Sequence, residues 1–443
     1  MKTKIGVVSL GCDKNRVDTE VMLQKLYDGG FEITSDPSVA DVIIVNTCAF
    51  LEESRKESID TILEMADYKQ VGNCKKIIVT GCLGQSFGKD VFDGMEEIDA
   101  VVGTYDYDNI CQIVLDALGG VRENYVNKNE CITFGQRVLT TPSHVAYLKI
   151  ADGCNNFCTY CLIPYIRGRY RSVPMEQIVD HAKDLAQKGV KELVVVAQDT
   201  TKYGIDLYGK LALVNLLKYL TAIEGIERIT LLYCYPELMT DELIAEIANN
   251  PKISKYLDIP LQHVDDSILK AMNRKSNHES ICKLFDKLAD AQISVRSTFI
   301  CGFPGETQEM VDEIADFLKK YKLRNVGFFA YSQEEGTMAA KMPNQLQKRT
   351  KNKYKNQLYK LQQSIARELN RADVGKVLRC IVDCFDSVDG EEYVYRARAE
   401  FMAPDIDGVV FVRSKVELPV GAFCDAKITG SSDYDLIGEV VQV

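Results

Sequence analysis

The sequence predicts an α/β chain in three parts: a doubly wound parallel sheet, a partial (βα)6 barrel and a small all-β domain at the C-terminus. The first part alternates apolar runs with amphipathic helical segments, and the middle part continues that alternation. The last part consists of short β-runs separated by turn residues. Alternating strands and helices give parallel sheets. We place the three domains at residues 1–122, 140–371 and 374–443.

Length and composition are typical of a globular protein with several domains. The chain has 443 residues, of which 46% are hydrophobic and 26% charged, and a chain of this length usually makes about three domains. Fifteen cysteines without an evident export signal indicate a reducing, cytoplasmic environment in which thiols bind metal. No run approaches the roughly 20 apolar residues of a membrane span. We expect a cytoplasmic monomer that makes no contact with membranes.

In the first domain, three predicted strands are each followed by a cysteine. The strands and their cysteines are 5–10 with Cys12, 42–45 with Cys48, and 77–79 with Cys82. The other predicted elements are a strand at 100–102 and helices at 18–27, 54–65 and 109–118, with Asp18 and Ser54 as N-caps of the first two helices. Together these elements make a small doubly wound sheet.

The three cysteines of this domain are predicted to meet in space. Carboxyl ends of parallel strands lie at one edge of a sheet, so Cys12, Cys48 and Cys82 converge despite their separation in the sequence. Three converging thiolates suit a 4Fe-4S cluster with one iron left open. The alternative is that each is a small buried hydrophobe, which is a common role of free cysteine. Recurrence at the same place in three repeats favours the cluster.

The middle domain contains a second series of strands and helices. Strands are predicted at 145–150, 193–197, 228–233, 256–259, 295–301 and 326–331, and helices at 175–188, 211–223, 241–249, 279–291 and 309–321. Six such units make an open, partial version of the eightfold barrel, in which chemistry takes place at the carboxyl ends of the strands.

A second group of cysteines, Cys154, Cys158 and Cys161, follows the first strand of the middle domain at spacing C-x3-C-x2-C. Three thiolates on a four-iron cluster leave one iron free to bind a substrate. Zinc sites usually have paired C-x2-C knuckles and a fourth Cys or His, which this loop lacks. The spacing, with Tyr160 before the last cysteine, resembles the radical S-adenosylmethionine superfamily, in which the open iron binds the methionine moiety of the cofactor.

Polar or glycine residues follow other strands of the middle domain, namely Gln198, Asp199, Gln262 and Gly302. Glycine lets backbone approach a ligand closely, and carboxylate or amide groups can bind an amino group or ribose hydroxyls. A capped turn explains each segment as well. With Tyr160, these residues form the predicted set of S-adenosylmethionine contacts.

A basic helix is predicted over residues 344–371. Its apolar positions on one face are Tyr354, Leu358, Leu361, Ile365 and Leu369. Its first turns carry Lys348, Arg349, Lys351, Lys353 and Lys355. The apolar stripe should pack on the barrel. The charged face is either solvated or in contact with ribosomal RNA.

The last domain is predicted to be a small closed or sandwich-like β domain. Its strands are predicted at 377–384, 393–398, 408–412, 422–428 and 435–440. From residue 374 onward it has seven Lys or Arg and thirteen Asp or Glu, a net charge of 7 minus 13, or −6. Such a surface suits a basic protein partner better than phosphate, and we selected Glu391, Glu392, Asp405 and Asp407 as surface carboxylates. Cys380 and Cys384 are predicted to lie on one strand face as structural residues.

These features together resemble the methylthiotransferase family over nearly the whole chain. The N-terminal motifs are Ser9-Leu-Gly-Cys12, Asn46-Thr-Cys48 and Gly81-Cys82. The branch that modifies a ribosomal protein is indicated by Asp152-Gly-Cys-Asn-Asn-Phe-Cys-Thr-Tyr-Cys161, Arg167-Gly-Arg-Tyr-Arg-Ser172, Ala197-Gln-Asp-Thr-Thr-Lys-Tyr-Gly204 and Tyr256-Leu-Asp-Ile-Pro-Leu-Gln-His263. The tail is similar to a TRAM domain. Relatives that modify tRNA typically have a Gly-Gln-Asn-Val type sequence at residues 198–201.

The resemblance implies two 4Fe-4S clusters and S-adenosylmethionine. One cofactor molecule methylates a sulfur held at the auxiliary cluster of the N-terminal domain, and a second is cleaved to a radical that removes hydrogen from an aspartate β-carbon. The implied substrate is the twelfth protein of the small ribosomal subunit, free or within the ribosome, and separate donors supply electrons and sulfur. No catalytic residue beyond the cluster ligands is implied, because the cofactor carries out the difficult step. His263 is therefore expected to make a structural hydrogen bond.

Two alternatives remain open from the sequence. A tRNA-modifying enzyme of the same family would be expected to have a basic tail domain. A non-catalytic binding module stabilised by metal would contain stoichiometric zinc and no acid-labile sulfide.

Overall fold

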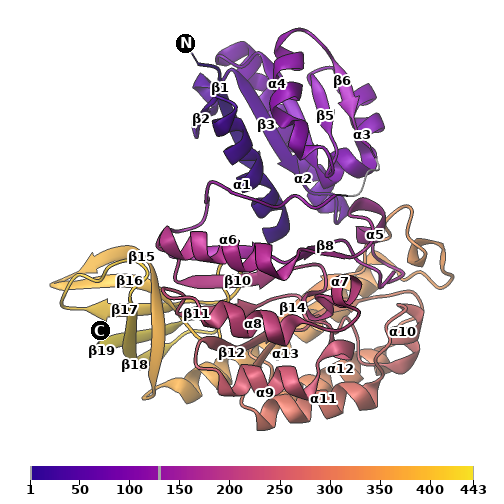
Figure 1. The fold of residues 1–443 in the computed structure, drawn as a ribbon. Coiled ribbons are helices and arrows are strands. Elements are labelled where there is room, and N and C mark those ends of the chain that lie inside the picture. The colour runs from indigo at the N-terminus through magenta and orange to yellow at the C-terminus, as the bar shows by residue number, and fades with distance from the viewer. Residues whose placement is uncertain (1, 128–130, 443) are drawn as a thin grey trace.

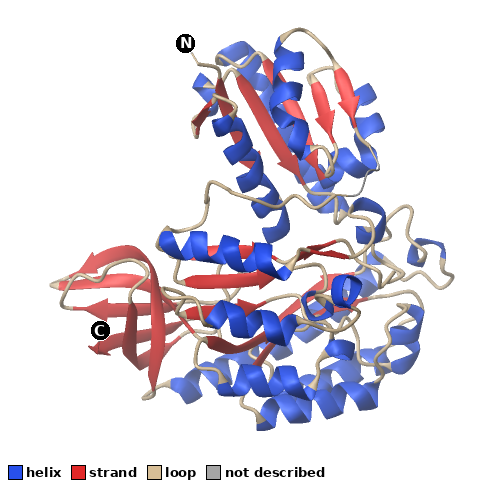
Figure 2. Cartoon of the chain, in the orientation of Figure 1, coloured by secondary structure: helices blue, strands red, loops and turns tan. Residues whose placement is uncertain are grey.

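The computed structural model describes residues 2–127 and 131–442, whose strands form three main sheets. Two are six-stranded and parallel, the third is a closed five-stranded barrel, and a short two-stranded pair accompanies them. Figure 1 shows the N-terminal sheet at the top, the middle sheet below it and the C-terminal barrel at the left. Helices cover the two parallel sheets, whereas the barrel is almost entirely strand (Figure 2). The predicted α/β fold class is confirmed.

The N-terminal sheet has the strand order β2-β1-β3-β4-β5-β6. Its strands are β1 (Lys4–Ser9), β2 (Glu32–Thr34), β3 (Val42–Thr47), β4 (Lys76–Gly81), β5 (Ala100–Val102) and β6 (Glu123–Tyr125). The four predicted strands are present. The two missed strands, β2 and β6, are three-residue edge strands with exposed or half-buried side chains, so they lack an apolar run.

Four α-helices of this domain run between its strands: α1 (Asp13–Asp28), α2 (Glu52–Val71), α3 (Cys82–Gly94) and α4 (Ile110–Leu118). The predicted N-caps of the first two helices were wrong. Helix α1 is capped by Cys12 and α2 by Leu51, and neither side chain accepts a capping hydrogen bond. Asp18 lies inside α1 with a fully buried side chain, because it faces cations of the middle domain.

The middle sheet has the order β14-β13-β12-β11-β10-β7, with every pair parallel. Its strands are β7 (Val145–Lys149), β10 (Glu192–Val196), β11 (Arg228–Leu231), β12 (Ile253–Asp258), β13 (Ser294–Cys301) and β14 (Asn325–Ala330). The longer helices that accompany it are α6 (Met175–Gln187), α8 (Leu213–Thr221), α9 (Asp241–Asn249), α11 (His278–Asp290) and α12 (Gln308–Tyr321). All six predicted strands are present in an open sheet, with one continuous apolar core beneath the helices. In Figure 1 the middle strands run from the side of the C-terminal barrel toward the loops beside α5.

The predicted basic helix is α13 (Lys348–Asp373). Its apolar stripe packs into the core of the middle domain, where Tyr354, Leu358 and Ile365 are buried. Lys351 is buried as well, and its ammonium group donates a 2.9 Å hydrogen bond to the Tyr331 carbonyl oxygen. Tertiary packing therefore removes this lysine from the charged face. In the described residues, no helix is long and apolar enough to cross a membrane.

The C-terminal barrel closes in the order β15-β16-β17-β19-β18. Its strands are β15 (Val377–Asp389), β16 (Glu392–Ala399), β17 (Val410–Ser414), β18 (Phe423–Ser431) and β19 (Leu436–Gln442). The prediction that Cys380 and Cys384 share one strand face was wrong. Cys380 is buried and Cys384 is exposed, because the register of β15 against β16 shifts between Val382 and Cys384. A bulge of this kind inverts the alternation of side chains.

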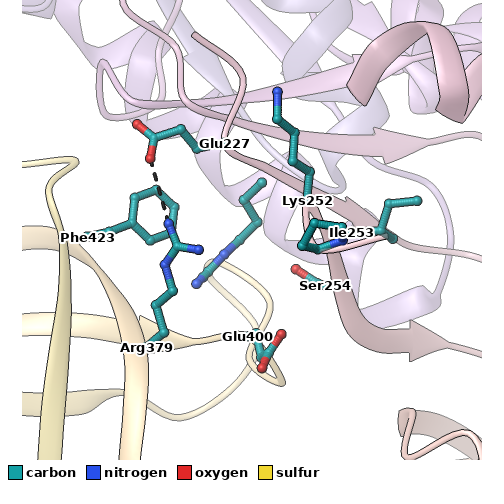
Figure 3. A pocket seen from close by; sticks show the side chains of 9 residues that line it. Glu227, Lys252, Ile253, Ser254, Arg379, Glu400 and Phe423 are labelled. Atoms are coloured by element: carbon teal, nitrogen blue, oxygen red, sulfur yellow. Dashed lines mark ion pairs between the residues drawn. The ribbon is translucent and has the colours of Figure 1, made fainter. Parts of the chain in front are cut away.

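Ion pairs connect this barrel to the amino ends of the middle strands. Buried Glu192 accepts hydrogen bonds from Arg398, whose guanidinium also binds Asp383. Figure 3 shows the pocket at this junction, where Arg379 of the barrel lies 3.9 Å from Glu227 of the middle domain and stacks over Phe423. Both signs of charge line the pocket, which is formed by the amino-end side of the sheet. The pocket is part of the contact between the barrel and the middle domain, and it is remote from the cysteine loops.

Candidate iron-sulfur centres

One cysteine triad, called the first triad from here on, consists of Cys154, Cys158 and Cys161. It lies on the loop that leaves the middle sheet after β7 and the short strand β8 (Ala151–Asp152). Cys154 and Cys158 are buried and Cys161 is half-buried. Backbone contacts fix the loop: the Cys154 amide donates to the Gly168 carbonyl at 3.1 Å, and the Thr159 amide donates to the Met272 carbonyl at 3.1 Å. The loop is therefore held at both ends by the protein itself.

Two polar groups lie against sulfur atoms of this triad. The Tyr235 hydroxyl lies 3.2 Å from Cys158 Sγ, and the Ile163 amide donates to Cys161 Sγ at 3.4 Å. Burial raises the pKa of Cys154 to about 11 and that of Cys161 to about 12. The free thiols of Cys154 and Cys161 are therefore protonated near neutral pH, and metal binding must release their protons.

The second triad consists of Cys12, Cys48 and Cys82 and lies at the carboxyl edge of the N-terminal sheet, as predicted. Cys12 precedes α1, Cys48 follows β3 and Cys82 is the first residue of α3. The neighbouring thiols of Cys12 and Cys48 both raise the pKa of Cys82, and Cys48 Sγ lies 3.3 Å from where a Cβ on Gly11 would stand. The helix N-termini at Cys12 and Cys82 favour negative charge there. Burial nevertheless raises the pKa of Cys82 to about 12.

Within the described residues, no group of three or more His, Cys, Asp or Glu side chains is placed to hold a single metal ion. The donors that each triad offers are three thiols, and cysteine thiolates are the usual ligands of iron-sulfur clusters.

Two of the predicted S-adenosylmethionine contacts have free acceptor atoms. Among the described residues, the side-chain oxygens of Gln198 and Gln262 are buried without a hydrogen-bond partner. The Gln198 side-chain amide nitrogen donates a 2.9 Å hydrogen bond to the carboxylate of Asp152, which lies two residues before Cys154. This hydrogen bond fixes the side chain of Gln198. Gln262 has a left-handed backbone, with φ of 71°. Strained residues with unpaired acceptors are typical of ligand sites.

The other three predicted contacts have structural partners. Asp199 accepts hydrogen bonds from Asn156 and Thr201, at 3.0 and 2.8 Å. Gly302 has φ of +81°, and a Cβ there would lie 2.3 Å from Lys351 Cγ. The approach of α13 therefore explains this glycine without a ligand. Tyr160 packs in a small apolar cluster between the barrel loops.

His263 makes structural contacts. Its Nδ1 atom accepts a 2.9 Å hydrogen bond from the Asp265 amide, and its Nε2 atom lies 3.3 Å from Glu306 Oε1. The imidazole is fully buried. Both ring nitrogens are engaged, so the histidine is a positioning group of the loop.

A buried charged network between the two triads was not expected from the sequence. Lys149 Nζ and Arg167 Nη1 each lie 2.5 Å from a different carboxylate oxygen of Asp18. Both cations also lie near Asp152, at 3.5 and 3.4 Å. Arg167 Nη2 donates to Asn15 Oδ1 at 2.6 Å and lies 3.6 Å from Cys82 Sγ. In the sequence, this network is signalled by Asp152 and Arg167, which are the first residues of the motifs at 152–161 and 167–172.

Comparisons with known proteins identify three regions of the chain. Residues 4–103 match the uncharacterized protein family UPF0004, residues 148–318 match the radical SAM superfamily, and residues 374–441 match the TRAM domain. A protein of Clostridium tetani named ribosomal protein uS12 methylthiotransferase RimO is 48% identical over 99% of this chain and 98% of its own length. The chain belongs to the RimO family. A RimO of Clostridium botulinum strain Eklund 17B is 49% identical, with the same coverage of both chains.

Membership of the RimO family makes the chain a radical SAM methylthiotransferase, which confirms the activity expected from the sequence. An iron-sulfur cluster and S-adenosylmethionine are its cofactors. Among solved structures, the radical S-adenosylmethionine methyltransferase TsrM of Kitasatospora setae matches 88% of this chain and 79% of its own, with a TM-score of 0.56 and 14% identity. The radical enzyme OxsB matches 81% of this chain and 56% of its own, with a TM-score of 0.52 and 13% identity. These two likenesses concern the fold alone.

Asp258, at the end of β12, makes the free energy of unfolding of the chain depend on pH. Burial raises the pKa of its carboxyl to about 6, although Arg296 nearby favours the charged form. Between about pH 4 and 6 the folded chain holds this proton and the unfolded chain does not, so the free energy of unfolding falls as pH rises. We expect Asp258→Asn to become more stable than the parent by about 2–3 kcal/mol above pH 6.

Urea denaturation of both proteins between pH 4 and 7.5 measures this difference. Asp316→Asn, which changes an exposed carboxylate, is the matched control. A stability difference between Asp258→Asn and its parent that did not vary with pH would contradict the assignment.

Proposed function

We propose that this chain transfers a methylthio group to the β-carbon of an aspartate in ribosomal protein uS12. The observation that supports the proposal most strongly is the near-complete coverage of relatives named for that activity, at 48–49% identity. The structure is consistent with it, because two cysteine triads lie on either side of one buried charged network. The proposed domains are residues 1–122, which contain the auxiliary triad, 140–371, which bind S-adenosylmethionine, and 374–443, which form the TRAM domain.

Each triad is proposed to hold one 4Fe-4S cluster. Cys154, Cys158 and Cys161 would hold the cluster that binds S-adenosylmethionine, and Cys12, Cys48 and Cys82 the auxiliary cluster. When bound, these groups supply the radical that removes hydrogen from an unactivated C–H bond, together with the methylthio group. The protein contributes placement, because it fixes the loops of both triads before the cofactors bind.

The residues around the first triad have separate proposed roles. Gln198 and Gln262 accept hydrogen bonds from S-adenosylmethionine through their unpaired oxygens. Tyr160 supplies an apolar wall, while Asp199 and Gly302 shape the loops around the cofactor. His263 is held by Glu306 and the Asp265 amide, so its imidazole is not available as a base. The reaction needs none.

The decisive experiment is mass spectrometry of ribosomal proteins and tRNA from cells that lack this gene. We expect uS12 to lose the mass of one methylthio group while tRNA keeps its modifications. Restoring the gene should restore the group. Loss of a methylthio group from tRNA, with uS12 unchanged, would overturn the proposed substrate in favour of tRNA.

The acidic surface of the TRAM domain is proposed to attract the basic substrate protein. The structure corrects the set of carboxylates selected from the sequence. The side chain of Asp407 is 1% exposed, and its carboxylate binds Arg296 and accepts a hydrogen bond from the Tyr256 hydroxyl. Asp405 pairs with Arg16 of α1. Both connect domains. Asp389 and Glu391, at the β15–β16 turn, are exposed, although Asp389 also pairs with Arg413 at 2.7 Å, and Glu392 is half-buried.

Reversing the charge of Asp389 and Glu391 to lysine should weaken uS12 binding several-fold at low salt and less at high salt, because exposed charges are screened. Cleavage of S-adenosylmethionine should not change. The matched control reverses Glu279 and Asp316, exposed carboxylates on helices of the middle domain. Substrate binding equal to that of the parent across a salt titration would show that the TRAM carboxylates only solubilise the protein.

The proposed contact with ribosomal RNA involves the exposed start of α13. Lys348, Arg349 and Lys353 are exposed there, whereas Lys351 is buried. The match to a TRAM domain is compatible with a nucleic-acid contact in addition to the protein substrate. The electron donor, the sulfur donor and the expected monomeric state remain predictions from the sequence.

A further inference from the structure

Arg167 extends from the middle domain to a cysteine of the N-terminal domain. It follows α5 (Ile163–Ile166), directly after the first cysteine loop. Its Nη2 atom lies 3.6 Å from Cys82 Sγ and donates a 2.6 Å hydrogen bond to Asn15 Oδ1. Asn15 itself donates to the carbonyl oxygens of Leu10 and Thr47, which lie next to the loops of Cys12 and Cys48. One guanidinium therefore contacts a proposed ligand sulfur and the side chain that braces the other two ligand loops.

Within the set of Arg167, Lys149, Asp18 and Asp152 the charges balance before any cluster is added, and a further buried cation, Lys14, lies close enough to interact with Arg167 and Cys12. Arg167 and Lys149 supply two positive charges, and Asp18 and Asp152 supply two negative charges, with at most 5% of any of these side chains exposed. A buried charge is tolerated when it is paired and hydrogen-bonded. A cluster held by three thiolates adds negative charge on the Cys82 side of the network. The guanidinium is the group of this network that touches that side.

The same network continues to the first triad. Asp152 lies two residues before Cys154 and accepts a 2.9 Å hydrogen bond from Gln198. Arg167 thus connects the auxiliary ligand Cys82, through Asp152, to a proposed S-adenosylmethionine contact. Planar guanidinium groups suit such a position, because they donate several hydrogen bonds in fixed directions.

We infer that Arg167 is a positioning residue for methylthio transfer, which holds the auxiliary cluster against the middle domain and stabilises the reduced form of that cluster. This inference rests on the proposed function, because it requires a cluster on Cys12, Cys48 and Cys82. Reduction adds negative charge to a cluster, and a nearby positive charge favours the state that carries it. The expected consequence of losing Arg167 is a more negative reduction potential.

The test uses the full chain with Cys154, Cys158 and Cys161 replaced by alanine, so that only the auxiliary cluster remains. In that background, redox titration followed by electron paramagnetic resonance compares Arg167→Gln with the parent. We expect the reduction equilibrium constant to fall about tenfold, which corresponds to about 59 mV for one electron. Arg167→Lys keeps the charge without the planar fork, so it should retain the cluster and shift the potential less.

Arg16→Gln is the matched control. Arg16 lies on α1 next to Asn15 and forms an ion pair with Asp405 at 3.0 Å; within the part of the chain that the structure describes, its guanidinium has no hydrogen bond to sulfur. It should leave the potential unchanged. Equal potentials for Arg167→Gln and its parent, at equal iron content, would overturn the inference while leaving the auxiliary cluster in place. A background protein without any cluster would instead overturn the proposed auxiliary site.

A second measurement separates positioning from general stability. With both clusters present, Arg167→Gln should still cleave S-adenosylmethionine, because the first triad is intact, but should transfer the methylthio group at least tenfold more slowly. Arg167→Lys should recover part of the transfer. An equal loss of cleavage and transfer in Arg167→Gln would show a merely structural role and overturn the inference.

Discussion

Replacement of Cys154, Cys158 and Cys161 by alanine is expected to abolish cleavage of S-adenosylmethionine while leaving one cluster on the chain. The parent should contain about eight irons and the variant about four, with matching acid-labile sulfide. The reason is that the two triads lie on separate sheets, each with its own loops and core. Iron and sulfide analysis of anaerobically purified protein, together with a cleavage assay, measures both effects.

The reciprocal variant provides the control. Alanine at Cys12, Cys48 and Cys82 should leave cleavage of S-adenosylmethionine intact and abolish transfer of the methylthio group. If the first variant bound no iron, the triads would not be independent sites. Stoichiometric zinc in the parent would exclude the enzymatic interpretation of both triads.

Loss of Asp18 should produce the largest change in stability. Its carboxylate is fully buried and contacts Lys149 and Arg167, each at 2.5 Å. Asp18→Ala leaves two buried cations with one fewer partner, and breaking a buried pair in this way costs about 3–5 kcal/mol. Because the contact joins two domains, we expect the N-terminal domain to unfold or detach at a lower urea concentration. Circular dichroism and limited proteolysis at increasing urea concentrations measure the change.

Asp28→Ala is the matched control for this prediction. Asp28 is the last residue of the same helix and is exposed, where its carboxylate accepts a hydrogen bond from Gln24. An exposed substitution of this kind should change stability by about 0.5 kcal/mol or less. Equal urea midpoints for Asp18→Ala and Asp28→Ala would mean that the network does not hold the domains together.

The sequence by itself determined the three-part fold and the location of both triads. Apolar runs such as those ending near Cys48 and Cys82 became buried central strands, because a parallel sheet covered on both faces requires continuous hydrophobic residues. The position of a cysteine directly after such a strand can be read from the order of the residues alone. Its position at the carboxyl edge followed from the parallel topology.

Local irregularities were decided by pairing between strands and by packing. The register shift in β15 places Cys384 on the exposed side, and the edge strand β6 forms because β5 offers it backbone partners. Neither depends on the apolar pattern from which the strands were predicted. Gly302 is explained by Lys351, which is distant in the sequence.

Only the tertiary structure decided which charged residues are structural. In the sequence, Asp18 is indistinguishable from a helix cap, and Asp407 from a surface carboxylate. The fold buries the first against Lys149 and Arg167 and the second against Arg296. The physical reason is that a charge leaves water only when a partner compensates its desolvation, and these partners lie more than a hundred residues away along the chain.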